Sequence, residues 1–483
     1  MGRYLGFDLG AESGRAILGT LDGARLTLQE VHRFSNDPVR LPTGLYWDTL
    51  RLFWEIRRGL HAARKTADQL DGAGVDTWGV DFGFLGRDGA LVDNPRHYRD
   101  TRTDGQMERT FAIVPRRDVF AATGIQFMQL NSLYQWHAMV QQHSPALETA
   151  ECLLFMPDLF NYWLTGEKRA EVTIASTSQF YNPVARTWAY GVLEPLRLRA
   201  SLLPKLIEPG TLLGPERETG VPVYATAGHD TAAAVAAVPA KGEGWCYISS
   251  GTWSLMGVET ATPVINDAAL EANFTNEIGV AGTVRLLKNI AGLWLWQECR
   301  RAWAEQGREY SYDQMASMAA EARPFSALLD PDAFLAPREM PRRIAEWCLS
   351  HGQQPPATDG EFCRATLEAL AFRYRQVLET LERLTGKPIT HIHIVGGGSK
   401  NALLNQFAAD ATGRPVLAGP VEATAIGNVL VQALGAREVS GMAELRQVVA
   451  DSFPLTVFEP RNAPQWEDAY AKWCRLLSSS APA

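Results

Sequence analysis

Short apolar runs alternate with helical stretches in the first part of the chain. The apolar runs at residues 4–8, 15–20 and 74–82 predict strands, and residues 49–65 predict a helix between them. Strands that alternate with helices are typical of an α/β sheet whose ligand-binding loops gather at one edge. We therefore expect the chain to begin with an α/β domain.

The clearest helical pattern lies in the second half of the chain. Apolar side chains recur there at three- and four-residue steps, at Cys363, Leu367, Leu370, Tyr374, Val377, Leu381 and Leu384. We expect Asp359 to cap this helix and Gly386 to end it. A strand at 391–395, a helix at 401–412 and a strand at 415–418 are expected to follow.

Two segments share one layout, in which an apolar strand, a turn of small polar residues and a returning apolar strand follow each other. They are residues 4–23 and 245–258. In the first, Asp8 ends the strand and Gly10 and Gly14 lie in the turn. Glycine-rich turns bring backbone N–H groups close to an anion, and a carboxylate at the strand end can organise Mg²⁺. Each segment is thus a candidate phosphate-binding hairpin, with an ordinary glycine-rich β-hairpin as the alternative.

Two further segments end predicted strands in polar or glycine-rich residues. Residues 221–235 deliver His229 and Asp230 to the first turn of a small helix, and residues 391–405 run through three glycines into another helix. A carboxylate placed like Asp230 can accept the proton of a substrate hydroxyl during phosphoryl transfer. Asp before Thr-Ala-Ala-Ala is equally a good helix N-cap, so the residues alone leave both interpretations open.

Composition and charge narrow the class of protein. The chain is 46% hydrophobic and carries a net charge of −8, which favours a well-packed enzyme and argues against a nucleic-acid partner. No apolar run approaches the ~20 residues that span a bilayer, and the N-terminus lacks the apolar core of a signal peptide. We expect a cytoplasmic protein with no membrane partner, as a monomer or small homo-oligomer. Free cysteines are expected, with a Cys348–Cys363 bridge as the alternative.

The order of these motifs resembles that in the actin-like (ribonuclease H-like) sugar-kinase ATPases, and their amino-acid sequences are similar to those of the FGGY carbohydrate kinases. Ten sequence motifs in the same order carry this resemblance across most of the chain: 8–15, 76–82, 98–102, 124–127, 156–158, 164–166, 228–231, 249–257, 287–295 and 419–423. The resemblance implies a two-domain α/β fold with an interdomain cleft. A polar connector at 239–244 places the expected boundary between domains 1–240 and 241–483.

The resemblance also implies the chemistry. It points to ATP and Mg²⁺ as cofactors and to a small ketose as substrate. Within the family the phrases are most similar to kinases that phosphorylate L-rhamnulose at its 1-hydroxyl. A sister kinase for another ketose such as L-fuculose, or an actin- or Hsp70-like ATPase switch, is the alternative. No G-x-x-x-x-G-K-[ST] loop occurs, so a P-loop is not the source of ATP binding.

The resemblance also implies which residues form the site, at positions where this sequence matches the motifs of the family. Asp230 is the expected catalytic base, and the ketose is expected to contact Gly79, His229, Asp230, Thr231 and Asn289. ATP is expected at Ala11, Glu12, Ser13, Gly14, Arg15, Thr252, Gln297 and Gly397, with Mg²⁺ held by Asp8 through water. Asn289 could instead cap a helix at 290–302. Asp81 and the phrase 98–102 are second-tier candidates that structural ion pairs would also explain.

One departure from the family bears on ATP binding. Sugar kinases usually place Thr after the first glycine of the opening hairpin, where this chain has Ala11. Glu12 adds a negative charge beside it. We expect poor ATP binding by this hairpin alone unless Arg15 offsets that charge.

Overall fold

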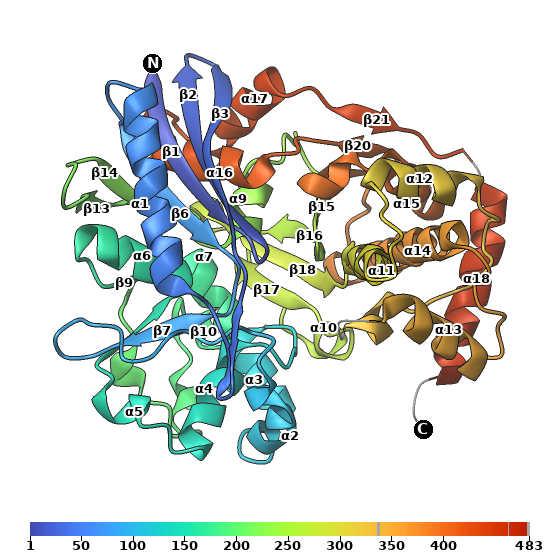
Figure 1. Cartoon of the computed structure of the whole chain (residues 1–483), viewed down its shortest axis with the longest axis horizontal. Coiled ribbons are helices and arrows are strands. Elements are labelled where there is room, and N and C mark those ends of the chain that lie inside the picture. The colour runs from blue at the N-terminus through green and yellow to red at the C-terminus, as the bar shows by residue number, and fades with distance from the viewer. Residues whose placement is uncertain (336–338, 462, 481–483) are drawn as a thin grey trace. The chain divides into compact units, whose positions relative to one another are not determined.

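The computed structural model describes residues 1–335, 339–461 and 463–480 (Figure 1). The chain forms two compact units, and each combines segments that are distant in sequence. Unit 1 consists of Met1–Pro239, Glu259–Leu286 and Ala423–Phe453, and unit 2 consists of Ala240–Val258, Leu287–Glu422 and the chain from Pro454 onward. The division into domains 1–240 and 241–483 expected from the sequence stays a prediction.

Unit 1 is built on a six-stranded sheet with the order β13–β14–β6–β1–β2–β3. Its strands are β1 (Gly2–Leu9), β2 (Ser13–Asp22), β3 (Arg25–Ser35), β6 (Gly72–Thr77), β13 (Thr211–Pro215) and β14 (Pro222–Ala225). β1 runs antiparallel to β2 and parallel to β6, and β6 runs parallel to β14. The carboxyl ends of three parallel strands therefore meet at one edge of this sheet.

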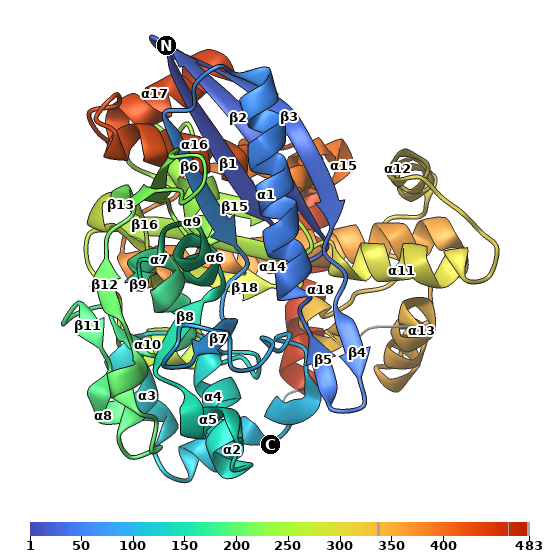
Figure 2. The ribbon, with the colours of Figure 1, turned by 60° about the vertical axis from the view of Figure 1, so that its left-hand side comes forward.

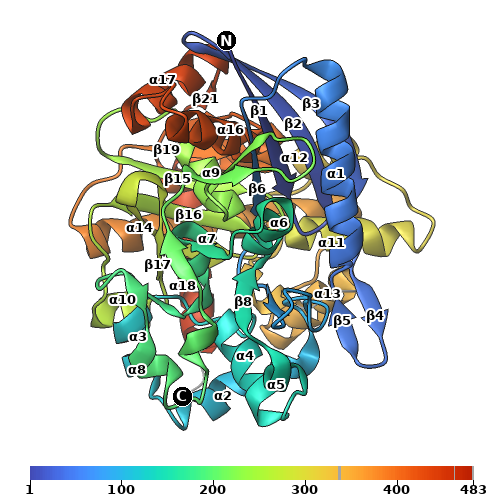
Figure 3. The same cartoon turned by 90° about the vertical axis from the view of Figure 1, so that its left-hand side faces the viewer.

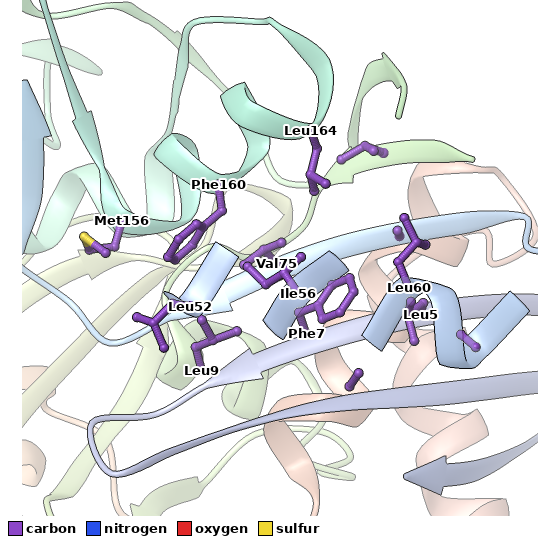
Figure 4. Packing of buried hydrophobic residues seen from close by; sticks show 14 of the residues in the cluster. Leu5, Phe7, Leu9, Leu52, Ile56, Leu60, Val75, Met156, Phe160 and Leu164 are labelled. Carbon is purple, nitrogen blue, oxygen red and sulfur yellow. The ribbon is translucent and has the colours of Figure 1, made fainter. Parts of the chain in front are cut away.

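One face of this sheet is covered by α1 (Thr49–Thr66) and α6 (Met156–Thr165), and Figure 2 shows α1 lying across it. Apolar side chains from both helices and from β1 and β6 interdigitate there (Figure 4): Leu5, Phe7, Leu9, Leu52, Ile56, Leu60, Val75, Met156, Phe160 and Leu164. Because this core fixes β1 and β6, it also fixes the polar residues at their ends.

The opposite face is covered by α16 (Ala423–Gly435), which lies across β1 from α1 (Figure 3). Its polar side chains bond the sheet itself. The amide of Gln432 donates to the carbonyl of Leu5 at 3.1 Å, and the amide of Asn428 donates to the Asp76 carboxylate at 2.6 Å. Since β1 has a helix on each side, its residues are almost all buried, as its continuous apolar run indicates.

Unit 2 contains β15 (Trp245–Ser250), β19 (His391–Val395), β20 (Val416–Ala418) and β21 (Thr456–Phe458), which are consecutive neighbours in a second sheet. β15 pairs in parallel with β19 and antiparallel with β16 (Ser254–Thr260), so the second hairpin repeats the layout of the first. The long helix α14 (Asp359–Thr385) packs beside α15 (Ala402–Thr412) (Figure 1).

In the second half of the chain, the helices and strands are of the predicted type, and only their first and last residues differ by a few positions. Gly386 ends α14 in a left-handed conformation as expected, but Thr358 rather than Asp359 caps its start, because the Thr358 side chain accepts from the N–H of Glu361. The helix expected at 290–302 is α11 (Trp294–Ala304). All six cysteines, including Cys348 and Cys363, are free thiols. None of the helices in the described ranges is long and apolar enough to cross a membrane.

The single strand expected at 74–82 is wrong. It is two strands, β6 and β7 (Phe82–Leu85), and β7 pairs with β8 (Cys152–Phe155) outside the main sheet. The break falls at Val80, whose φ of 70° is unusual for a β-branched residue and costs roughly 1–3 kcal/mol. The Thr177 hydroxyl accepts from the Val80 N–H at 3.1 Å and the Ser132 hydroxyl donates to its carbonyl, so tertiary contacts hold this turn.

Candidate active site

Acidic side chains converge at the carboxyl edge of the unit 1 sheet. Asp8, one residue before the end of β1, lies directly beside Asp76 on β6, and Thr77 forms a parallel bridge with His229, which follows β14. Asp230 is the next residue. Three adjacent parallel strands thus bring Asp8, Asp76 and Asp230 to one place, and sequence reasoning had assigned no role to Asp76.

Asp76 is the most deeply buried of these carboxylates. Burial, followed by the charge of Asp8, raises the pKa of Asp76 well above its usual range, and Asp230 acts in the same direction. The hydrogen bond from Asn428 opposes this rise but does not cancel it. The Asp76 Oδ1 has no hydrogen-bond partner among the described residues. A cation bound at this edge would lower the pKa of Asp76 again and stabilise both carboxylates as anions.

The first hairpin is braced on both sides of its turn. Arg15 forms an ion pair with Asp8 at 2.5 Å, opposite it on the neighbouring strand. Asn36 closes the loop, since its side-chain amide donates to the Gly10 carbonyl at 2.8 Å and its N–H donates to the Glu12 carbonyl at 3.0 Å. Arg15 thus places its positive charge beside the turn that also carries Glu12. Sequence analysis missed the clamp made by Asn36.

The two glycines of this turn differ. A Cβ on Gly14 would overlap the ring of Phe34, so packing against that ring already requires glycine there. A Cβ on Gly10 would lie 3.5 Å from the Ser13 carbonyl, which is an ordinary contact. The absence of a side chain at Gly14 is therefore explained by the fold and does not by itself indicate a ligand.

Asp230 is the first residue of α9 (Asp230–Ala236), and His229 occupies the N-cap position without a capping side-chain bond. The carbonyl of His229 accepts from the N–H groups of Ala232 and Ala233. The carboxylate Oδ1 of Asp230 accepts from the N–H and hydroxyl of Thr231, at 2.5 and 3.0 Å. The N-cap interpretation of Asp230 is thus wrong. Its side chain is 31% exposed, and no described residue bonds its Oδ2.

The turn before Asp230 is held by a buried carboxylate that sequence analysis missed. Glu171 accepts from the N–H of Gly228 at 2.9 Å and from the Thr173 hydroxyl at 2.5 Å. That hydroxyl in turn accepts from the N–H of His229 at 3.3 Å. Burial raises the pKa of Glu171 to about 7, although the hydrogen bonds from Thr173 and the backbone oppose the rise. Two consecutive N–H groups ahead of Asp230 are therefore fixed in place.

Gly79 lies beside His229. A Cβ on Gly79 would be 3.4 Å from His229 Nε2 and 3.4 Å from the Thr177 hydroxyl, both ordinary contacts. The protein therefore has room for a methyl group at this position, and packing alone does not demand glycine. His229 Nδ1 faces the other way, toward Glu277 on β17 (Thr275–Ile278) and Arg285 on β18 (Val284–Ile290), which sequence analysis also missed.

Asp81 proves to be a structural centre. Its carboxylate accepts from four N–H donors, at 2.6–3.1 Å: Trp47 Nε1, Trp78 Nε1, Gln135 Nε2 and the backbone of Tyr98. Burial raises the pKa of Asp81 to about 6. The phrase 98–102 belongs to the same centre, since Arg102 donates to Gln135 at 2.7 Å. With both oxygens occupied, Asp81 organises the turn after Gly79.

In unit 2, the second hairpin is tied to the start of α11. The carbonyls of Gly251 and Thr252 accept from the N–H groups of Leu293 and Trp294, both at 3.1 Å. Gln297 lies one turn further along α11, and its Oε1 is buried without a hydrogen-bond partner among the described residues. The start of α11 thus brings Gln297 near Thr252, and the Oε1 of Gln297 remains as an acceptor without a hydrogen bond.

The glycines after β19 also gather at this hairpin. A Cβ on Gly398 would overlap the Ser250 hydroxyl, and one on Gly396 would lie 3.0 Å from the Ser250 carbonyl. Gly397 is exposed, and a Cβ there would meet no described atom within 4 Å. Asn289 lies inside β18, so the interpretation that it caps a helix is wrong.

Two sequence models identify the family. Those of the N-terminal and C-terminal domains of the FGGY family of carbohydrate kinases match residues 3–236 and 246–436. The chain belongs to this family. The resemblance inferred from the motifs is confirmed, and the chain is a carbohydrate kinase that uses ATP.

Individual relatives agree with this FGGY assignment. The chain is 44% identical over 477 residues to the rhamnulokinase of Bacteroides thetaiotaomicron, covering 97% of this chain and 98% of that one. It is 38% identical over 469 residues to the rhamnulokinase of Bacillus subtilis, covering 95% and 96% of the two chains.

Solved structures share the fold of this FGGY kinase. Ligand-bound xylulose kinase from Lactobacillus acidophilus has a TM-score of 0.81 at 15% identity and covers 99% of this chain and 98% of its own. Glycerol kinase from Plasmodium falciparum with ADP has a TM-score of 0.80 at 15% identity and covers 100% and 99%. The expected two-domain sugar-kinase fold is confirmed.

Proposed function

We propose that this kinase phosphorylates L-rhamnulose at its 1-hydroxyl, giving L-rhamnulose 1-phosphate and ADP, in rhamnose catabolism. The observation that carries the proposal is the 38–44% identity, over nearly the whole chain, to relatives named rhamnulokinase. The structural neighbours are named for other substrates, xylulose and glycerol, and share only the fold at this level of identity.

In the proposed mechanism, Asp230 accepts the proton of the sugar hydroxyl. Its Oδ1 is fixed by Thr231, so its Oδ2 is the oxygen left to take that proton. The N–H groups held by Glu171 and Thr173 keep this carboxylate in position. Gly79, His229, Thr231 and Asn289 are proposed to contact the ketose, and the space beside Gly79 supports this because a side chain there would fill it. A positioned base of this kind contributes about 10²–10⁴-fold to rate.

The phosphates of ATP are proposed to lie at the turns of the two hairpins, on residues Ala11–Arg15 and Thr252. The charge of Arg15 beside the first turn supports this assignment. Gln297 and Gly397 are proposed for adenosine, supported by the unused Oε1 of Gln297 and the open space at Gly397.

Mg²⁺ is proposed at the acidic edge, held by Asp8 through water. No group of three or more His, Cys, Asp or Glu side chains in the described part of the chain could hold a metal ion directly. The adjacent carboxylates of Asp8 and Asp76 nevertheless fit a hydrated cation, whose charge would favour their ionised forms. When bound, Mg²⁺ would neutralise charge on the transferred phosphoryl group.

We propose that the chain has two domains, 1–240 and 241–483. The family models support this division, because the N-terminal match ends at residue 236 and the C-terminal match begins at residue 246. We propose a cytoplasmic monomer or small homo-oligomer, in the compartment that supplies ATP.

A coupled ADP-release assay tests the function. ATP turnover with the purified chain should be fastest with L-rhamnulose and slow with L-fuculose, D-xylulose and glycerol, and ³¹P–¹H correlation should place the phosphate on C1. Preference for L-fuculose would assign the chain to a sister kinase. ATP hydrolysis of equal rate with and without sugar would refute sugar phosphorylation altogether.

A further inference from the structure

His229 has two different environments on its two ring nitrogens. Nδ1 faces a buried pair, with Arg285 Nη2 at 3.2 Å and Glu277 Oε2 at 3.3 Å. Nε2 faces the side of the proposed sugar site, 3.4 Å from Asp230 Oδ1 and 3.4 Å from the position of a Cβ on Gly79. A neutral imidazole carries one proton, so the residues at Nδ1 decide what Nε2 can do.

Arg285 is held firmly in this arrangement. Its side chain has 0% exposure, and its Nε donates to the carbonyl of Ile278 at 3.2 Å. Its Nη2 also forms an ion pair with Glu277 Oε2 at 3.1 Å. Burial would raise the pKa of Glu277, but the charge of Arg285 opposes this rise, and that pKa lies below its ordinary value. The pair therefore stays charged, and each member balances the other in a buried place.

The hydrogen-bond geometry distinguishes the two tautomers. Arg285 Nη2 forms a hydrogen bond with Nδ1, whereas Glu277 Oε2 makes no hydrogen bond to any described residue. A guanidinium only donates, so Nδ1 must be the bare nitrogen and the proton lies on Nε2. The opposite tautomer would leave a lone pair on Nε2 facing the carboxylate of Asp230.

We propose that Arg285, balanced by Glu277, is a positioning residue that fixes His229 as its Nε2–H tautomer. His229 then presents a hydrogen-bond donor beside the base Asp230 and the ketose, where an oxygen of either can accept it. The functional consequence rests on the proposed function. The tautomer itself is a property of the free protein.

The first measurement is ¹H–¹⁵N multiple-bond correlation NMR of kinase labelled at its nine histidines, without sugar and at pH 8. The His229 signals are assigned from the spectrum of His229→Gln. We expect a protonated Nε2 and a bare Nδ1. A protonated Nδ1 in the wild-type protein would overturn the proposal, whichever ketose the enzyme prefers.

The second measurement uses the double variant Arg285→Met/Glu277→Gln, which removes both buried charges together. The thioether introduced by Arg285→Met cannot donate to Nδ1, and the amide introduced by Glu277→Gln can accept from Nδ1–H as well as donate to a bare Nδ1. The variant therefore no longer excludes the Nδ1–H tautomer, whose signals should appear in the spectrum. The kcat on the best ketose should fall at least tenfold with little change in the KM for ATP. A switched tautomer with wild-type kcat, or a lower kcat with an unchanged tautomer, would each refute the positioning role.

A matched control removes the ion pair of another buried arginine. Arg373 is buried in unit 2 and forms an ion pair with Asp330. Arg373→Met/Asp330→Asn should leave the His229 tautomer and kcat unchanged. An equal fall in kcat in this control would mean that any loss of a buried pair slows the enzyme, and the proposal would fail.

Discussion

Asp230→Asn isolates the proposed base from its surroundings because the structure separates the two carboxylate oxygens. Asn keeps an oxygen at the Oδ1 position, so it can still accept from the N–H and hydroxyl of Thr231. It replaces Oδ2, the proposed proton acceptor, by an amide that cannot take a proton. A fall in kcat of about 10²–10⁴-fold is expected, equal to a rise of about 3–5 kcal/mol in the activation free energy.

The stability of this variant should hardly change. A negative charge in the first turn of a helix is worth about 0.3–1 kcal/mol, and α9 loses it. Its loss also removes one of the charges that raise the pKa of the buried Asp76, which offsets the cost. Asp230→Ala should be less stable, because it loses both bonds to Thr231 at about 1 kcal/mol each.

Asp267→Asn is a matched control, because Asp267 is likewise the first residue of a helix, α10 (Asp267–Glu271), and is exposed. Its kcat should equal that of the wild type. The assays are steady-state ADP release and urea unfolding followed by circular dichroism. A folded Asp230→Asn enzyme whose kcat lies within about threefold of the wild type would remove Asp230 from the proton transfer, since a positioned base contributes far more than this.

Further variants test the other assignments. A methyl group fits at Gly79, so the melting temperature of Gly79→Ala should equal that of the wild type. If the sugar lies beside His229, the KM of this variant for the ketose should rise at least tenfold. An unchanged KM would show that Gly79 is not part of the sugar site. Gly397→Ala should raise the KM for ATP in the same way, with equal affinity as the contrary result. Asp8→Asn should lose most activity and regain part of it in excess Mg²⁺; near-normal turnover at limiting Mg²⁺ would make the first hairpin structural. In the folded state the pKa of Glu171 is about 7, above its ordinary value of 4.5, so the folded protein binds this proton more tightly than the unfolded chain does. As the pH rises from about 4.5 to about 7, the unfolding free energy should therefore fall by up to about 3 kcal/mol from this group. Urea titrations should show a flatter pH slope in Glu171→Gln, and an identical slope would contradict the assignment.

Local pattern was enough to predict much of the fold. β1 is a continuous apolar run because helices cover both of its faces, and α14 shows its periodicity over many turns. The break between β6 and β7 could not be predicted in this way. The apolar pattern continues through it, and Val80 is a poor turn residue whose conformation depends on hydrogen bonds with Ser132 and Thr177. These partners come from distant segments, which no local pattern reveals.

The candidate site divides along the same line. His229 and Asp230 stand in one recognisable phrase, but Asn428 reaches Asp76 across 352 positions of the chain. Arg285 stands among apolar neighbours in β18, where a lone arginine is a weak signal without knowledge of its partner. Its role becomes visible only when β17 and β18 are seen to place Glu277 and His229 around it.

A glycine in a family motif does not by itself mark a binding site, because packing within the protein can also require glycine. Gly14 and Gly398 belong to the proposed phosphate and adenosine motifs, yet the Phe34 ring and the Ser250 hydroxyl occupy the space a Cβ would need. Glycine at these two positions would be required for folding even in a protein that bound nothing. Gly79 and Gly397 have room for a methyl group, so the fold does not explain why they lack one. If Gly79→Ala and Gly397→Ala lose substrate affinity while keeping their stability, the requirement for glycine would come from a ligand, which we propose to be the ketose at Gly79 and the nucleotide at Gly397.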